Sequence, residues 1–173
     1  MKTKTYKKTK RIIGVFFSVG LMLAATLQNC EARSPERPQD CAYRWVVLTS
    51  PDGQTSFRIK AEQANTPETK AKGLMFRNSM PLDQGMIFYW DKPQPIYMWM
   101  KNTLIPLDMV FAARGKVLGV VEAVQTESEK ILTVPSQADT VLEVNLGVAT
   151  SQGVTAGWSI KPASCAKANE GKI

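Results

Sequence analysis

The chain has 173 residues, with 22 lysines and arginines, 15 aspartates and glutamates, and no histidine. The absence of histidine excludes Ser-His-Asp and Cys-His catalysis, together with any metal site built on imidazole ligands. Phosphate-binding glycine loops and dinucleotide-binding motifs are also absent. We therefore expect neither a cofactor nor a bound metal.

The N-terminus has the pattern of a secretory signal. Basic residues precede an apolar segment, residues 12–27, that is too short and too interrupted for a membrane helix. Two kinds of processing fit: cleavage after Ala32, or lipidation of Cys30, although Asn29 stands where a lipidation motif prefers a small residue. We expect a signal peptide over residues 1–32, or a lipoprotein leader ending before Cys30. The protein is then exported to the periplasm or cell envelope, either soluble or lipid-anchored.

The mature chain is close to neutral. The leader carries six of the 22 basic residues and one of the 15 acidic residues, which leaves 16 and 14. No basic stripe interleaved with aromatic residues remains, so nucleic acid is excluded as a partner. We expect a monomer that meets the membrane only through its leader or lipid anchor.

A tether rich in proline and charge, residues 33–40, leads to a single domain over residues 41–165. The small polar tail, residues 166–173, is expected to be disordered. Cys41 and Cys165 bracket the domain, one before the first expected strand and one after the last. In an exported protein they are expected to form a disulfide, which would stabilise the fold by roughly 4–5 kcal/mol.

Short segments rich in β-branched and aromatic residues predict strands within the domain. They lie at residues 43–48, 56–61, 85–90, 96–101, 106–112, 116–124 and 140–146. Thr66 as N-cap and Pro67 as the first helical residue predict a helix that either ends near Gly73, which limits its regular length, or continues to Met75, and a shorter helix is expected near residues 148–152. The pattern predicts a mainly β protein, a single compact antiparallel β-sandwich or barrel with one or two short helices.

A polar run inside an apolar stretch, residues 99–108, is the candidate site. If residues 102–105 form a hairpin loop, Trp99 lies opposite Asp108, and Lys101 comes within reach of an ion pair with Asp108. The other face of the hairpin is then apolar core. Its residues are Ile96, Met98, Met100, Leu107, Met109 and Phe111.

Two interpretations of the polar face stay open. It is either a solvated sheet surface with one weak salt bridge or a shallow binding site. In the second case Tyr97 and Trp99 form a stacking platform for a polar ligand. The groups that orient the ligand are then those of Lys101, Asn102 and Asp108.

Charged residues outside the run are weaker candidates. Arg77 either anchors the first helix by pairing with a carboxylate or binds an anionic ligand. Glu143 alternates with Val141 and Asn145 on one face of a strand, where a surface-facing acid is the simplest explanation. For catalysis the chain offers carboxylate and lysine acid–base chemistry. The candidates for such a role are Asp108, Glu143 and Lys101.

Five blocks of sequence carry a resemblance to a known family. They are Thr66-Pro67-Glu68 and residues 72–77, 85–88, 99–108 and 141–145. Together they resemble the uncharacterised bacterial and archaeal family called domain of unknown function 192 (DUF192), over residues 57–160. The resemblance implies a compact, mostly β domain with jelly-roll-like topology and one short helix, commonly exported. It implies no established reaction or ligand.

The resemblance also selects residues to test. Those that match the family's polar and aromatic motif positions are Arg77, Trp99, Lys101, Asn102, Thr103, Asp108, Glu143 and Asn145. The expected ligand-binding set is Arg77, Tyr97, Trp99, Lys101, Asn102, Thr103, Asp108 and Asn145. Our first hypothesis is an exported binding or accessory module for a small polar ligand, a saccharide in particular. The alternatives are a hydrolase that uses carboxylate acid–base residues and a structural envelope protein without a small-molecule ligand.

Overall fold

The computed structural model describes residues 41–166, which lie within one compact unit of the chain, Pro35–Ile173. The expected leader, the tether, Cys30 and residues 167–173 fall outside the described residues. Ala166, which the sequence placed in a disordered tail, is buried, and its N–H donates to the Tyr43 carbonyl at 3.0 Å. Within residues 41–166, no helix has the length and apolar character needed to cross a membrane.

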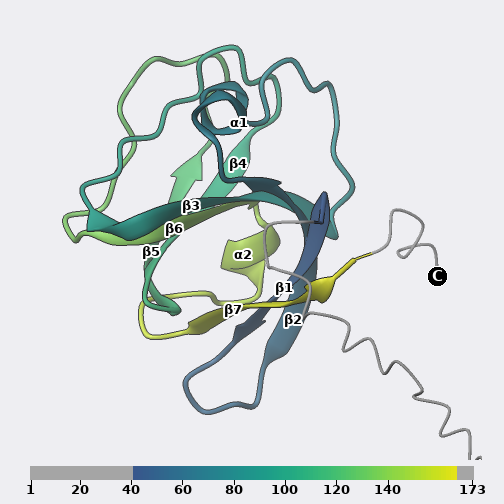
Figure 1. The fold of residues 1–173 in the computed structure, drawn as a ribbon, viewed down its shortest axis with the longest axis vertical. Coiled ribbons are helices and arrows are strands. Elements are labelled where there is room, and N and C mark those ends of the chain that lie inside the picture. Colours follow the sequence, from purple (N-terminus) through teal and green to yellow (C-terminus); the bar gives the residue numbers. More distant parts are fainter. Residues whose placement is uncertain (1–40, 167–173) are drawn as a thin grey trace, which may run out of the picture. The chain divides into compact units, whose positions relative to one another are not determined.

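In the described part of the chain, seven strands form a closed barrel in the order β1-β2-β3-β6-β4-β5-β7 (Figure 1). The strands are β1 (Tyr43–Thr49), β2 (Ser56–Ala64), β3 (Gln84–Gln94), β4 (Leu107–Ala113), β5 (Lys116–Ala123), β6 (Ala138–Asn145) and β7 (Ser159–Cys165). The two short helices are α1 (Pro67–Lys72) and α2 (Val148–Ser151). The predicted mainly β barrel or sandwich with one or two short helices is confirmed.

One neighbouring pair in the barrel is parallel, whereas the prediction was antiparallel throughout. Strands β2 and β3 run side by side in the same direction, from Lys60↔Gln84 to Ala64↔Phe88. A parallel pair needs a crossover connection that leaves the sheet and returns to its starting end. Helix α1 lies in this crossover, and it begins as the sequence predicts, with Thr66 as N-cap and a capping box with Thr69.

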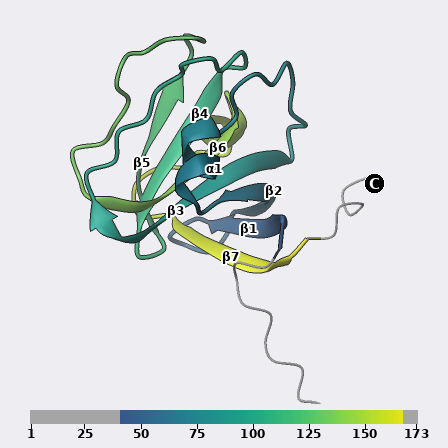
Figure 2. The same ribbon diagram turned by 45° about the horizontal axis from the view of Figure 1, so that its top comes forward.

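Strands β3, β6 and β4 are buried on both faces. The face toward the barrel interior carries Ile87, Val110, Ala112, Leu142 and Val144, packed in one cluster with Ala149 of α2. The outer face carries Met86, Phe88, Met109, Phe111 and Val141, which pack in a second cluster with Leu74, Ile96, Met98 and Met100. Figures 1 and 2 show α1 outside this part of the sheet, and Figure 1 shows α2 enclosed by the strands. The two faces therefore belong to two separate cores.

The predicted hairpin between residues 96–101 and 106–112 does not form. Strand β4 pairs with β5 and β6 instead. The segment before it crosses the outer face as irregular chain, with one isolated bridge, Met98↔Leu132. Every residue of the predicted apolar face is nonetheless buried in the outer cluster. The alternation of apolar residues thus predicted burial correctly and the strand partner wrongly.

Strand β7, which the sequence analysis missed, lies along β1 and completes the barrel. On its other side β7 pairs with β5, and one residue pair, Lys116↔Ser159, joins these two strands. Only Ile160 of its residues is fully buried, so β7 lacks the apolar alternation that marks the other strands. The barrel is therefore closed by a narrow seam on one side of β7.

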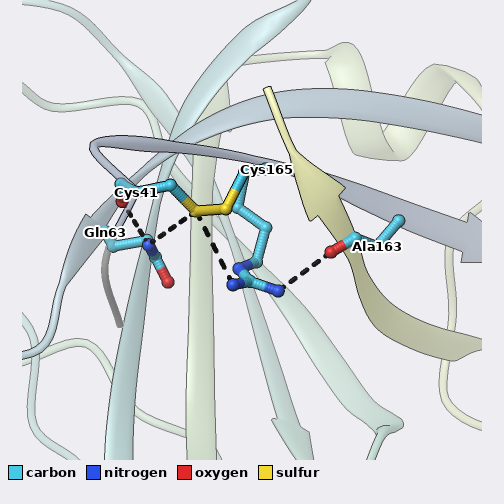
Figure 3. Close-up of a disulfide and its surroundings, with 5 residues drawn as sticks. Cys41, Gln63, Ala163 and Cys165 are labelled. Carbon is cyan, nitrogen blue, oxygen red and sulfur yellow. Dashed lines mark hydrogen bonds between the residues drawn. A yellow bond between two sulfur atoms is a disulfide. The ribbon is translucent and has the colours of Figure 1, made fainter. Parts of the chain in front are cut away.

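The other side of β7 is held by the predicted disulfide, which is confirmed. Cys41 and Cys165 are bonded with a Cα–Cα distance of 5.7 Å, and Figure 3 shows Gln63 and Ala163 beside them. A guanidinium N–H of Arg44 donates to the Ala163 carbonyl at 2.9 Å, and Gln63 donates to the Cys41 carbonyl. The bond thus ties the start of the domain to the end of its last strand.

Removing this bond is expected to weaken the barrel strongly. The disulfide joins residues 124 positions apart, and a loop of that length corresponds to about 5 kcal/mol in the chain-entropy model. The double variant Cys41→Ser/Cys165→Ser should lose a comparable part of its free energy of unfolding in urea. Wild type measured with reductant should match it. Equal urea midpoints for the double variant and oxidised wild type would contradict this expectation.

Candidate functional site

A pocket of about 290 Å³ lies on the outer face of the sheet, beside α1. Its walls come from α1 and the residues that follow it, from β3, and from the irregular segment before β4. The aromatic lining residues are Phe88, Trp90, Tyr97 and Trp99. The polar ones are Lys70, Lys72, Thr103 and Glu143, and the remaining lining residues are Ala71, Gly73, Leu74, Met75 and Met98.

Two of the aromatic lining residues pack against each other, and the other two are exposed. Trp90 of β3 stacks on Phe88 with ring centroids 6.3 Å apart, and the ammonium of Lys70 lies 4.9 Å from the Trp90 ring. Tyr97 and Trp99 remain 66% and 44% exposed, respectively, although both are large aromatic residues. Exposed aromatic side chains at a pocket are suited to packing against a ligand.

Gly73 shapes the edge of the pocket where α1 ends. Its φ of 49° lies in the left-handed region, and a Cβ at this position would contact the Phe88 ring at 3.4 Å. Glycine adopts this conformation without the steric penalty that other residues meet. Gly73 therefore lets the chain turn sharply at the end of α1 and pass close to the Phe88 ring.

The most unusual group of the pocket is the Glu143 carboxyl group. Glu143 lies opposite Met86 and Met109 in the central strands of the sheet and is only 4% exposed. None of the described residues donates a hydrogen bond to this carboxyl group or forms an ion pair with it. Burial raises its pKa to about 8, so the carboxyl group is mostly protonated at neutral pH. The expectation that Glu143 faces solvent is wrong, because α1 and the segment before β4 cover this face.

Asp108 lies on the opposite face of the same sheet and has a different role. It is fully buried. Its Oδ2 accepts hydrogen bonds from the N–H groups of Ala149 and Thr150 at 2.9 and 3.1 Å, at the start of α2. Its Oδ1 has no hydrogen-bond partner within residues 41–166. Asp108 therefore satisfies backbone donors inside the barrel, and the predicted ion pair with Lys101 does not form.

Lys101 and Asn102 form a turn at the edge of the site. The Thr103 N–H donates to the Met100 carbonyl at 3.0 Å, and Asn102 has a φ of 53°. Asparagine is one of the residues that tolerate this conformation in turns. The Lys101 ammonium pairs with Glu129 at 3.1 Å and lies 5.3 Å from the Trp99 ring. The backbone conformation of the turn thus accounts for an asparagine at position 102. The Lys101 side chain packs over the Trp99 ring.

Arg77 and Asn145 hold the chain that follows α1. Arg77 makes two parallel hydrogen bonds to the Glu62 carboxylate, at 2.5 and 2.7 Å, and these raise the pKa of Arg77. This is the carboxylate pairing considered for Arg77 in the sequence. The Asn145 side chain donates to the carbonyls of Met80 and Pro81 at 3.0 and 3.1 Å. Both residues support the pocket wall without lining it.

The structure thus divides the expected ligand-binding residues. Tyr97, Trp99 and Thr103 line the pocket, together with Glu143 from the catalytic candidates. Those that do not line it are Arg77, Lys101, Asn102, Asp108 and Asn145. Four lining residues were not predicted from the sequence: Lys70 and Lys72, which the parallel crossover brings to the pocket in α1, and Phe88 and Trp90, which lie on β3.

A family model supports the resemblance on a separate basis. The model for DUF192, described as Uncharacterized ACR, COG1430, matches residues 47–162. The chain belongs to the DUF192 family. The resemblance inferred from the five sequence blocks is confirmed.

Two solved crystal structures are similar to this DUF192 chain. One is a "putative transcription regulator" from Sinorhizobium meliloti 1021, with 34% identity and a TM-score of 0.67, covering 70% of this chain and 95% of that one. The other is a protein of unknown function from Novosphingobium aromaticivorans DSM 12444, with 32% identity and a TM-score of 0.64, covering 69% and 84%. The search of curated proteins found no match to the chain.

Substitutions of Asp108 and Lys101 should have very different effects on stability. Asp108→Ala leaves two N–H groups of α2 without their acceptor, so we expect a loss of about 2–4 kcal/mol in the free energy of unfolding. Lys101→Met removes a partly exposed ion pair and should cost less than about 1 kcal/mol. Urea denaturation of both variants tests this. Similar large losses for both would instead favour the direct Lys101–Asp108 pair.

The ionisation of Glu143 should make the fold less stable as the pH rises. The raised pKa means that the folded chain keeps this proton up to about pH 8, whereas an unfolded glutamate loses it near its ordinary pKa of 4.5. Between these values the wild type should lose on the order of 1 kcal/mol of stability per pH unit relative to Glu143→Gln. Urea denaturation of both proteins from pH 5 to 9 measures the difference. Parallel stability curves would exclude a raised pKa.

Proposed function

We propose that this domain binds a saccharide unit in the pocket of Glu143, and that it acts as a binding or accessory module. The observation that carries the proposal is the buried Glu143 carboxyl group, which has no partner among the described residues and lines the pocket. A buried polar group without a hydrogen bond costs stability. Such a group in a pocket is a candidate for ligand recognition because a ligand can supply the missing partner.

The lining of the pocket favours a saccharide over other small ligands. A protonated carboxyl group donates one hydrogen bond and accepts others, which matches the hydroxyl groups of a sugar. Tyr97 and Trp99 supply exposed rings that can pack against the apolar face of a sugar ring. The volume of about 290 Å³ lies at the lower end of ligand pockets, so it suits a single sugar unit.

A hydrolase remains the second candidate, for one reason. A protonated glutamate at neutral pH is what a general acid requires, and the pKa of Glu143 is raised to about 8. The usual glycosidase mechanism needs a second carboxyl group near the first. Asp108 cannot provide it, because it faces the barrel interior and binds α2. Binding without catalysis is therefore the better supported function.

We also propose that the protein is exported. The disulfide between Cys41 and Cys165 supports this, since such bonds persist mainly in oxidising compartments. The basic and apolar N-terminal sequence gives a second, independent reason. Mass spectrometry of the mature protein from cells would reveal cleavage after Ala32 or acylation of Cys30. A full-length chain with free thiols would contradict export.

Titration calorimetry against a glycan panel tests the binding proposal. Trp99→Ala should weaken the binding of any sugar that the wild type binds by about tenfold or more, because a stacking face is lost. Trp45→Ala is the matched control, because Trp45 lies on β1 under Arg58 and does not line the pocket. Equal affinities for wild type and Trp99→Ala, or no binding of any glycan, would contradict the proposal.

A further inference from the structure

We infer that the ligand is an anionic saccharide, a sugar unit that carries a carboxylate or a phosphate held by Lys70 at the rim of the pocket. This inference rests on the proposed function, because it names the class of sugar for the same pocket. The acidic and basic side chains that line the pocket are those of Lys70, Lys72 and Glu143.

Within the described residues, the two lysines of the pocket have no acidic partner. In residues 41–166, the ion pairs are Arg77–Glu62 and Lys101–Glu129, and neither includes Lys70 or Lys72. Lys70 is half-buried, and its ammonium is held over Trp90. The pocket therefore presents an ordered positive charge next to an aromatic face.

The acid of the pocket does not neutralise this charge. Glu143 is buried among apolar side chains, and its carboxyl group is mostly neutral at pH 7. The titratable groups that line the pocket with it are Lys70 and Lys72 of α1 and Tyr97 of the segment before β4. A neutral ligand would form no ion pair with the lysines at the rim. The charged group of an anionic sugar would meet an ammonium at the rim, and the hydroxyl groups of the same sugar would meet the Glu143 carboxyl group in the interior of the pocket.

A purely structural role would also explain the position of Lys70. The experiment must distinguish that role from ligand binding. Lys70 and Lys72 lie in the last turn of α1, where positive charge is favourable. Stacking on Trp90 adds to this. A structural role predicts that a change at Lys70 lowers stability and leaves the preference among sugars unchanged. A binding role predicts a change of preference in a protein that remains folded.

The experiment compares matched sugars by titration calorimetry on the mature protein. Glucuronate and galacturonate are measured beside glucose and galactose, and glucose 6-phosphate distinguishes phosphate from carboxylate as the anionic group. The variants are Lys70→Gln, Lys70→Arg as the charge-conserving form, and Lys161→Gln as a control for net charge. Lys161 is exposed on β7 and does not line the pocket. Melting temperatures confirm that each variant folds.

Wild type should bind at least one anionic sugar about tenfold more tightly than its neutral counterpart, and this preference should weaken with salt. Lys70→Gln should remove the preference, Lys70→Arg should keep it, and Lys161→Gln should have no effect. If neutral sugars bind as tightly as anionic ones, the inference fails while the proposed saccharide site stands. If no sugar binds, both fail. If Lys70→Gln binds anionic sugars as wild type does, the assignment to Lys70 is wrong.

Discussion

The central strands β3, β6 and β4 are covered on both faces, and this constraint decides what every polar group on them can do. Each face holds one buried carboxyl group. Asp108, on the inner face, accepts two N–H groups at the start of α2 through Oδ2, which compensates part of the cost of its burial, whereas its Oδ1 has no partner within residues 41–166. Glu143, on the outer face, lies opposite two methionines and has no such partner among the described residues. The two acids lie on opposite faces of one sheet, yet one accepts backbone hydrogen bonds and the other has no partner among the described residues.

The parallel crossover determines which residues surround Glu143. Because β2 and β3 run in the same direction, the chain between them must cross outside the sheet, and α1 lies there. This brings Lys70 over Trp90 and places Gly73 against Phe88. The irregular segment before β4 covers the rest of the outer face and supplies Tyr97 and Trp99. Arg77 and Asn145 then hold the intervening chain through Glu62 and the Met80 and Pro81 carbonyls.

The sequence predicted local features well and long-range partners poorly. Thr66 as helix cap, the disulfide and the burial of Ile96, Met98 and Met100 were all predicted, because each depends on nearby sequence or on cysteine positions. The predicted hairpin was wrong because segments adjacent in the sequence were assumed to pair, whereas β4 pairs with β5 and β6. For Glu143 a signal was present but was not used. Apolar residues stand at 141, 142 and 144, on both faces of the strand, which indicates a strand covered on both sides.

A protein that keeps Glu143 accepts a stability cost that a glutamine or leucine would avoid. The cost is smallest when the carboxyl group is protonated, which is the form favoured below a pKa of about 8. The protonated form is also the one that offers both a donor and an acceptor to a sugar. If the proposed ligand accepts the carboxyl proton in a hydrogen bond, it stabilises this form further, so ligand binding and protonation of Glu143 should support each other. Under the proposed function, the burial that weakens the fold at high pH therefore also keeps Glu143 in the form that would donate a hydrogen bond to the ligand.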